Sequence, residues 1–357
     1  MAIIDKPSEH FETSLYTGTG SSLAISGLNF APDFTWIKGR SGATEHVLTD
    51  SVRGVTKELS SNDDGAEETV AQGLTAFGTD GFTVGTDGSY NTSSATYASW
   101  NWKAGTAVSG ATTGAGTAKT YTGSVNTTSG FSIIKYTGNG TAGHTIPHNL
   151  GVTPSAIFVK GLVVADWTSY HSVLGNTGYM RLNNTNAFAT ASTYWNNTSP
   201  TSSVFTLGTT GNVNANGNDF IAYCFAEVKG YSKFGSFIGN GSTNGIFVHL
   251  GMKPAFVMIK KTTGGTANWI TYDNKRLGYN PTTKRLIPNL SDAEQTITDD
   301  IDFLSNGFKL RTAGTGENHS GQTHIYMAFA EQPFVTSTTN GSIPATARWW
   351  YCLDVWN

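Results

Sequence analysis

The 357-residue chain has few charged residues and no long hydrophobic run. Lys, Arg, Asp and Glu make up 13% of it, well below the usual share, and the formal net charge is −3. No cluster of Lys or Arg occurs, so the basic surface that nucleic-acid binding requires is missing. No stretch approaches the length of a membrane span, and the opening MAIIDKPSEHF lacks the segments of a signal peptide. We expect synthesis in a cytoplasm, no nucleic-acid partner and no membrane insertion.

Cysteines and catalytic signatures are also scarce. The two cysteines, Cys224 and Cys352, are too few for a disulfide framework, and Cys224 lies in the apolar run FIAYCFAEV, which favours a buried free thiol. The chain contains no Gly-x-Ser-x-Gly elbow, no His-Glu-x-x-His motif and no cysteine with a supporting histidine pattern. We therefore predict that the protein is not an enzyme and uses no cofactor.

The residues that are abundant indicate strands and turns. Glycine occurs 42 times, and short aromatic and β-branched clusters alternate with Gly, Ser, Thr and Asn. Helix-favouring runs of Ala, Leu, Glu and Lys are almost absent. This composition predicts an all-β protein. One short helix is expected at 290–304, where Ser291 and Glu294 have the spacing of a capping box.

One segment occurs three times, as LNFAPDFTWIKG at 28–39, LGVTPSAIFVKG at 150–161 and LGMKPAFVMIKK at 250–261. Each copy has a leucine, a proline four residues later and a lysine six residues after that. The lysines are Lys38, Lys160 and Lys260. We interpret the segment as a loop that enters a strand, because proline can begin a strand without its missing N–H.

The flanking sequences keep the same order in each copy. An aromatic with Gly-x-Gly precedes the segment (YTGTG, YTGNG, FIGNG), and an aromatic strand closes each copy (YASWNWK, IAYCFAEVKG, IYMAFAEQP). The prolines are 122 and 100 residues apart, and removing the 23 residues of 106–128 makes the first spacing 99. We predict three tandem β-sandwich, jelly-roll-like repeats at 1–105, 129–229 and 230–334. A flexible Gly/Ser/Thr-rich linker is expected at 106–128 and an aromatic C-terminal tail at 335–357.

Several polar motifs have structural explanations. The Gly-x-Gly loops lie between strands, so we expect hairpin turns and no phosphate site. His144 and His148 are expected to be structural. Asp-x-x-Arg occurs at 50–53 and at 273–276, which predicts ion pairs within the copies. The acidic SNDDGAEE at 61–68 does not fit a calcium loop and favours a solvated turn, although Ca²⁺ near Asp63 and Asp64 stays open as an alternative.

Aromatic residues near Asp and Asn are candidates for contact with sugars, because sugars pack on aromatic rings and bind amide and carboxylate groups. The glycan-binding candidates are Trp167, Tyr170, Trp195, Trp269 and Tyr272. The last residues, ARWWYCLDVWN, have apolar groups on both faces of any strand and need to be covered. Candidates for an oligomer or docking contact are Trp349, Trp350, Tyr351, Leu353 and Trp356.

The motifs PSEHFETSLYTGTGS, YASWNWKAG, GFSIIKYTGNGTAGHTIPHNLGVTPSAIFVKG, DFIAYCFAEVKGYSKFGSFIGNGS and IYMAFAEQP resemble a β-repeat family of uncharacterised virion and tail-fibre-like proteins of marine bacteriophages. The resemblance extends to about SIPATAR and carries no residue roles. It implies a virion structural protein, in the tail or a fibre, that takes part in host attachment.

The expected location is the virion, assembled in the host cytoplasm. Its expected partners are other virion proteins and a host-surface glycan, and self-association is a further expectation. Two alternatives stay open, a carbohydrate-binding adhesin and a head decoration or head-fibre protein. A glycan-degrading enzyme would need two close carboxylates in a cleft, which no motif indicates.

Overall fold

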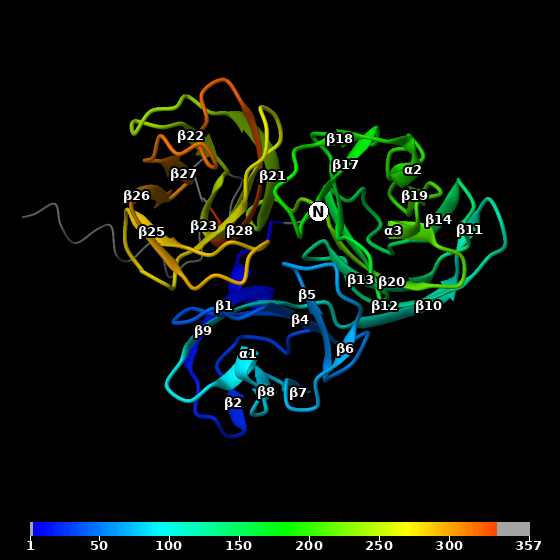
Figure 1. The fold of residues 1–357 in the computed structure, drawn as a ribbon, viewed down its shortest axis with the longest axis horizontal. Helices are drawn as coiled ribbons and strands as arrows, with labels where there is room; N and C mark the ends of the chain where they lie inside the picture. Colours follow the sequence, from blue (N-terminus) through cyan, green and yellow to red (C-terminus); the bar gives the residue numbers. More distant parts are fainter. Residues whose placement is uncertain (1–2, 334–357) are drawn as a thin grey trace, which may run out of the picture.

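The computed structural model describes residues 3–333 and is built from strands in six sheets, which confirms the predicted all-β class. The helices among these residues are one turn long: η1 (Pro7–Glu9), α1 (Gly88–Asn91), α2 (Ser192–Trp195) and α3 (Gly211–Asn214). The sheets form three β-sandwiches, which appear as three lobes around a common centre (Figure 1).

Sandwich 1 (residues 11–102) has an inner sheet of six strands and an outer sheet of three. The inner sheet has the order β1 (Phe11–Thr17), β9 (Thr96–Trp102), β3 (Phe34–Gly39), β4 (His46–Asp50), β5 (Lys57–Ser60), β6 (Glu68–Thr69). The outer sheet has the order β2 (Leu23–Ile25), β8 (Phe82–Val84), β7 (Leu74–Phe77).

Sandwich 2 (residues 106–225) has an inner sheet of eight strands and an outer sheet of three. The inner order is β10 (Thr106–Ala111), β12 (Thr120–Asn126), β13 (Phe131–Thr137), β20 (Asp219–Phe225), β15 (Ala156–Gly161), β16 (Thr168–His171), β17 (Gly178–Arg181), β18 (Ala189–Thr190). The outer order is β11 (Thr113–Gly114), β14 (His144–Pro147), β19 (Val204–Leu207).

The segment predicted as a flexible linker is therefore mostly strand. β12 pairs with β13, and β10 pairs in turn with β12, so 106–126 widens the inner sheet of sandwich 2. Tyr121 and Val125 are buried on one face of β12. Gly123 permits the close approach of the strands, because a Cβ there would lie 2.4 Å from the carbonyl oxygen of Ile133. In TYTGSVN the polar residues Thr, Thr, Ser and Asn alternate with Tyr121, Gly123 and Val125, which is the two-residue period of a strand. The high content of small residues in 106–128 concealed this signal.

Sandwich 3 (residues 232–333) has two four-stranded sheets. The inner order is β21 (Ser232–Ile238), β28 (Thr323–Pro333), β23 (Met252–Lys261), β24 (Trp269–Asp273). The outer order is β22 (Phe247–His249), β27 (Gly307–Leu310), β26 (Gln295–Leu304), β25 (Thr282–Arg285). The helix predicted at 290–304 is wrong, because β26 occupies most of it and pairs with β27 and β25.

The inner sheets share one strand order, β1-β9-β3-β4, β13-β20-β15-β16 and β21-β28-β23-β24. Their registers also agree, since Trp36 lies opposite Trp100, Phe158 opposite Tyr223 and Met258 opposite Met327. The repeated Leu/Pro/Lys segment ends in β3, β15 and β23. Pro254 lies within β23 at a register shift, where a strand tolerates proline.

The central strands of each inner sheet are buried on both faces. In β15, Ile157 and Val159 pack inside sandwich 2, whereas Ala156 and Phe158 point to the opposite face. That face joins a cluster with residues from all three sandwiches, which we call the axial core; its members include Trp36, Trp100, Trp102, Phe131, Phe158, Trp167, Tyr223, Phe225, Tyr231, Phe234, Phe256, Trp269, Met327 and Phe329. Double-sided burial explains why the aromatic strands are apolar almost throughout.

Three equivalent rings meet in the axial core. The ring centroids of Trp102 and Phe225 are 6.2 Å apart, those of Trp102 and Phe329 5.5 Å, and those of Phe225 and Phe329 5.7 Å. One ring comes from the last inner strand of each sandwich. The sandwiches therefore surround one shared aromatic centre with approximate threefold symmetry.

The repeated lysine of each copy crosses an interface between two sandwiches. It lies on the axial face of its strand and is fully buried. Its ammonium group donates a hydrogen bond to a backbone carbonyl of a neighbouring sandwich: Lys38 to Ser291 at 3.1 Å, Lys160 to Gly65 at 2.6 Å and Lys260 to Thr185 at 3.0 Å. Sandwich 1 thus contacts sandwich 3, sandwich 2 contacts sandwich 1, and sandwich 3 contacts sandwich 2, so the interfaces close into a ring.

Two backbone hydrogen bonds accompany each of these lysines. Beside Lys38, Thr44 N–H donates to Ser291 O and Glu294 N–H donates to Arg40 O. Beside Lys160, Ala165 N–H donates to Asp64 O and Glu67 N–H donates to Leu162 O. Beside Lys260, Ala267 N–H donates to Thr185 O and Phe188 N–H donates to Thr262 O. The three interfaces therefore use the same backbone geometry, whatever side chains surround it.

Buried ion pairs support two of the interfaces and confirm the predicted pairing within the copies. Arg53 Nε lies 2.5 Å from Asp50, and Arg276 Nε lies 2.5 Å from Asp273, with no solvent exposure of these side chains. Each aspartate also binds the next sandwich: Tyr223 donates to Asp50 at 2.7 Å, and Trp100 donates to Asp273 at 3.1 Å. His171, which replaces the aspartate in the second copy, lies 3.2 Å from the carbonyl of Tyr326.

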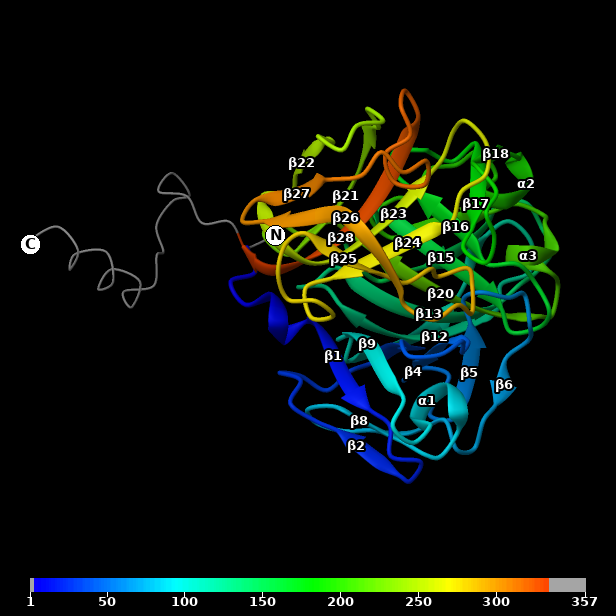
Figure 2. The same ribbon diagram turned by 60° about the vertical axis from the view of Figure 1, so that its left-hand side comes forward.

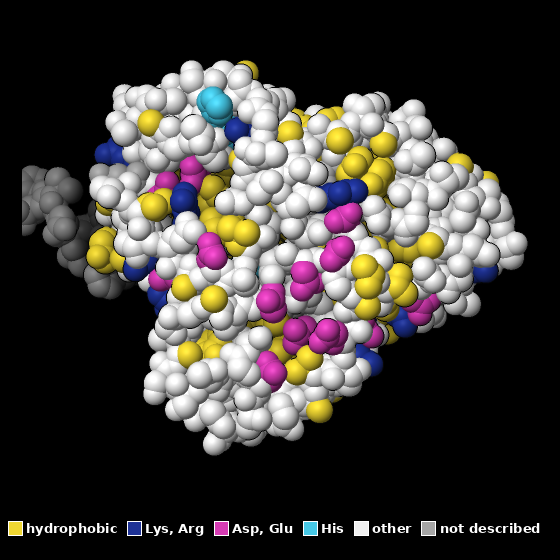
Figure 3. All heavy atoms as spheres, viewed as in Figure 1, with side chains coloured by type: hydrophobic (Ala, Val, Ile, Leu, Met, Phe, Trp, Pro, Cys, Tyr) yellow, Lys and Arg dark blue, Asp and Glu magenta, His cyan; other side chains and the backbone are white. Residues whose placement is uncertain are grey.

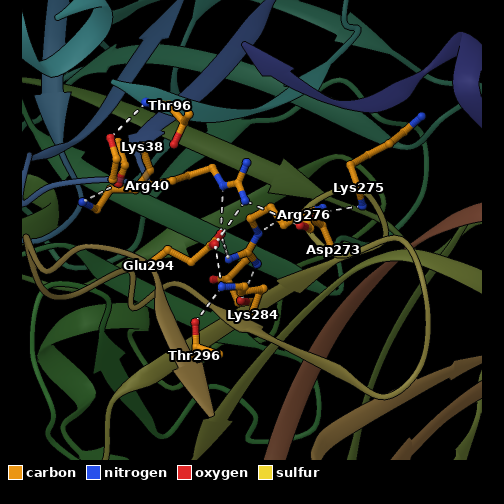
Figure 4. A network of polar contacts seen from close by, with 12 residues as sticks. Lys38, Arg40, Thr96, Asp273, Lys275, Arg276, Lys284, Glu294 and Thr296 are labelled. Carbon is orange, nitrogen blue, oxygen red and sulfur yellow. Dashed lines mark hydrogen bonds and ion pairs between the residues drawn. The ribbon is translucent and has the colours of Figure 1, made fainter. Parts of the chain in front are cut away.

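Figure 4 shows how the interface between sandwiches 1 and 3 collects charge around Glu294. Arg40 binds both oxygens of this carboxylate, at 2.9 and 3.1 Å, and Arg276 approaches it from sandwich 3 at 3.5 Å. A two-point contact between guanidinium and carboxylate fixes orientation as well as distance. This pair therefore adds directional contacts to the shared apolar packing.

Replacing Lys160 by Met should destabilise the protein. The Lys160 ammonium also donates to the carbonyls of Gly161 and Val163, at 2.9 and 3.3 Å, and methionine leaves these acceptors without a donor. We expect a loss of about 1–3 kcal/mol in the free energy of unfolding, measured by urea denaturation. Lys135→Met is the control, because Lys135 makes a partly exposed pair with Asp219. Equal losses in the two variants would contradict the role given to Lys160.

Removing Arg276 should lower the free energy of unfolding more than removing an exposed arginine does. Arg276→Met leaves the Asp273 charge buried without its cation, for which a loss of about 3–5 kcal/mol is expected. Arg311→Met removes a side chain that is 45% exposed and 3.5 Å from Asp302, and should cost less than about 1 kcal/mol. The free energy of unfolding of both variants is measured by thermal and urea denaturation. Equal losses in Arg276→Met and Arg311→Met would contradict the prediction.

Candidate functional site

The five aromatic residues predicted to bind glycans lie in the interior. Trp167, Tyr170, Trp195, Trp269 and Tyr272 are at most 5% exposed. They cannot serve as stacking surfaces for a sugar, and the prediction that they form such surfaces is wrong. Their neighbouring polar residues suggested loops, but Tyr170 lies in β16, and Trp269 and Tyr272 lie in β24, which are inner strands covered on both faces. Trp167 directly precedes β16, and Trp195 is buried at the end of helix α2.

The indole N–H groups of Trp167 and Trp269 join neighbouring sandwiches. The Trp167 indole donates to the carbonyl of Ser60 at 2.7 Å, and the Trp269 indole donates to that of Arg181 at 2.8 Å. Both bonds cross an interface between sandwiches. Tyr170 and Trp195 pack edge to face, with centroids 5.7 Å apart.

The residues predicted to make an oligomer or docking contact, Trp349, Trp350, Tyr351, Leu353 and Trp356, lie outside the described residues. The same holds for Cys352. Cys224 is a buried free thiol, as predicted, and burial raises its pKa to about 12.

Each Gly-x-Gly loop encloses a buried asparagine that the sequence analysis missed. The side chain of Asn214 accepts from the backbone N–H of Asn139 at 3.0 Å and donates to the carbonyls of Thr141 and Gly208. Asn91 and Asn318 make the matching contacts in the other sandwiches. The loops therefore hold a side chain of the same sandwich. The signal was an Asn shortly before each closing strand, in the unlike contexts SYNTSS, NVNANG and ENHSG.

The histidine and acidic motifs are explained by internal contacts. His144 lies 2.9 Å from the Asn214 amide and 2.7 Å from the Thr112 hydroxyl. In the acidic loop, Asp63 accepts from the N–H of Gly65 at 2.8 Å, and Glu67 lies 3.4 Å from Arg53. Within residues 3–333, no group of three or more His, Cys, Asp or Glu is arranged to hold a metal ion.

Acidic side chains nevertheless gather along the middle of one face, where the sandwiches meet (Figure 3). Carboxylates lie near two of the three interface lysines, Glu45 and Asp292 near Lys38 and Asp63, Asp64 and Asp166 near Lys160. Burial lowers the pKa of Lys160 to about 8, and Asp63, Asp64 and Asp166 act in the opposite direction. These carboxylates reduce the cost of burying the ammonium group.

Two carboxylates that are distant in sequence come together in sandwich 3. Asp300 and Glu317 are buried, and both lie near the guanidinium of Arg285, which binds Glu317 directly. Tyr272 donates to Asp300 at 2.5 Å. Burial, together with the neighbouring Glu317 carboxylate, raises the pKa of Asp300 to about 7. A pair of this kind suits acid–base chemistry only if a substrate can reach it, and these two side chains are covered.

An open cleft of about 280 Å³ lies at the edge of sandwich 3 and is the candidate functional site. It is bounded by the start of β23, the turn after β24, the loop before β25 and the end of β28. Its principal side chains are Lys253, Asn274, Lys275, Tyr279, Asn280 and Glu331. Tyr279 is 69% exposed, the highest value among the large aromatic residues that the structure describes.

Glu331 organises the polar side of this cleft. Its carboxylate accepts from the Lys253 ammonium at 2.9 Å and from the Asn274 amide at 2.8 Å. Asn280 is held by two hydrogen bonds to the backbone of Phe303, both 2.8 Å long. The loop that carries Tyr279 is thereby fixed to β26.

Sandwich 1 has a cleft in the equivalent place with different chemistry. The backbone bond from Ser51 N to Asp33 O matches that from Asn274 N to Ala255 O, so Asp33, Ser51 and Val52 correspond to Ala255, Asn274 and Lys275. The sandwich 1 cleft measures about 510 Å³ and is lined by Asp33, Val52 and the hairpin of β10 and β12, with no lysine and no aromatic residue. The basic and aromatic lining belongs to sandwich 3.

The fold and contacts define a chain of three β-sandwiches closed around an aromatic core. Residues 6–333 match the family described as a domain of unknown function (DUF7483), and the protein belongs to this family. No curated protein and no solved structure matches the chain. Across the part of the chain described, none of the helices could span a membrane.

Asp300→Asn should change how stability depends on pH. Because the pKa of Asp300 is raised to about 7 in the folded state and is about 4 in an unfolded chain, folding favours the protonated form. The stabilisation from this group is full below about pH 4 and is lost as the pH rises through 7.

The measurement is the free energy of unfolding of both proteins between pH 4 and 8. The wild type should lose stability relative to Asp300→Asn across this window, on the order of 4 kcal/mol, because the amide does not titrate. Parallel profiles would show that Asp300 is not protonated in the folded protein.

Proposed function

We propose that the protein is a non-enzymatic structural component of a phage virion, in the tail or a fibre, that takes part in attachment to the host. The observation that carries the proposal is the closure of three sandwiches around one core. Such a unit is a rigid support that presents loops at fixed positions. Its partners would be other virion proteins and a surface glycan of the host.

The residues behind the resemblance to tail-fibre-like phage proteins support this proposal, because they build the ring. The repeated lysines join neighbouring sandwiches, and the closing aromatic strands supply Trp102, Phe225 and Phe329 to the axial core. The family motifs are therefore architectural. Variation between family members would fall on the loops and clefts at the rim.

The way polar groups are used favours a structural role over catalysis. The buried carboxylates Asp50, Asp273 and Asp300 are each bound to a cation or a hydroxyl of the same chain. A catalytic group has to be within reach of a substrate.

A carbohydrate-binding adhesin is the second candidate, and the cleft beside Tyr279 favours it. In this alternative the same scaffold binds cells directly. A head decoration or head-fibre protein is the third, and it would bind capsids and not cells.

The test is to locate the protein on the particle and to measure its binding to cells. Antibodies against the folded chain are used for immunogold labelling of phage particles, and fluorescent full-length protein is added to host cells. Label on the tail or fibres with cell binding would support the proposal. Label only on capsids would replace it with the head alternative, and absence of label from purified particles would overturn it.

A further inference from the structure

We propose that the cleft lined by Lys253, Lys275, Tyr279 and Glu331 binds a carboxylated sugar, such as a uronic acid unit of a surface polysaccharide. The inference deepens the proposed attachment function and rests on it for its biological setting. The chemistry of the cleft is argued from its own residues.

The apolar side of the cleft suits the face of a sugar ring. Tyr279 is 69% exposed, and Phe303 lines the same cleft. An exposed aromatic ring offers a flat surface against which the C–H groups of a pyranose can pack. Flat apolar contact beside convergent polar groups is the common design of small-ligand sites.

The polar side of the cleft suits hydroxyl groups and one carboxylate. Lys253 gives one hydrogen bond to Glu331, so an ammonium group with three donors keeps capacity for a ligand. Lys275 lies 4.0 Å from Glu12, which is too far for a hydrogen bond. The lining holds two lysines and one glutamate. Glu12 beside Lys275 offsets part of this positive charge, and the Lys275 ammonium keeps its hydrogen-bond donors for an anionic ligand.

The cleft is organised before a ligand arrives. The bonds of Glu331 to Lys253 and Asn274 and those of Asn280 to Phe303 hold both walls. A rigid site loses little conformational entropy on binding. A single sugar unit should therefore bind measurably, with a Kd of about 1 mM.

The experiment measures binding of glucuronic acid to the full-length protein by isothermal titration calorimetry, with glucose and inorganic phosphate as comparison ligands. Tyr279→Ala removes the aromatic surface, and Lys275→Met removes a cation that makes no hydrogen bond within residues 3–333. Each should weaken glucuronate binding at least tenfold. Matched controls are Phe247→Ala, an exposed aromatic on β22, and Lys229→Met, an exposed lysine, and both should bind as the wild type does.

Each alternative result overturns a stated part of the proposal. Glucose binding as tightly as glucuronate would refute the requirement for a carboxylate. Phosphate binding as tightly as glucuronate would refute recognition of the sugar. No binding of glucuronate, or equal loss in the control variants, would refute the site.

Cell binding separates failure of this inference from failure of the proposed function. If Tyr279→Ala binds cells as the wild type does, attachment stands and the cleft is not its route. If the wild type binds glucuronate but neither cells nor particles, the site stands and the proposed function fails.

Discussion

Burial of the central inner strands on both faces is the constraint on which the rest of the structure depends. One face of each sheet completes its own sandwich, and the other enters the axial core with residues from all three. Burying an aromatic or aliphatic side chain contributes about 1.5–3 kcal/mol, and the axial core contains many of them. A sandwich separated from the ring would expose this face to water, so the three sandwiches depend on one another.

Apolar packing supplies most of the stabilisation, and the polar contacts set the geometry. A buried hydrogen bond contributes about 0.5–1.5 kcal/mol, less than one buried aromatic side chain. The lysine and its two backbone bonds nevertheless recur at each interface with the same directions. The two ribbon views show the three sandwiches that these contacts join (Figures 1 and 2). Since the interface runs head to tail and closes within one chain, each sandwich has both of its interface surfaces occupied by the other two sandwiches within residues 3–333.

The copies keep the centre of the ring and differ at the rim. The centre of the axial core has a large ring from each sandwich, Trp102, Phe225 and Phe329, whereas the turn after the fourth inner strand carries Ser51 and Val52, Ser172 and Val173, or Asn274 and Lys275. Only the third version adds lysine, asparagine and an exposed tyrosine around a cleft. A scaffold fixed by its core is free to vary at its rim, and the candidate site lies there.

The sequence by itself determined the all-β class, the threefold recurrence of Leu, Pro and Lys, the Asp-Arg ion pairs and the buried Cys224, because each is a local pattern of composition or spacing. It did not determine that 106–126 forms strands or that Trp167 and Trp269 are interior, because both depend on which other strands cover them. Only the tertiary structure brought Lys253, Asn274, Tyr279 and Glu331 to one cleft and Asp300 to Glu317. Their separations along the chain carry no periodic signal, and their proximity arises from strand order and the closing of the ring.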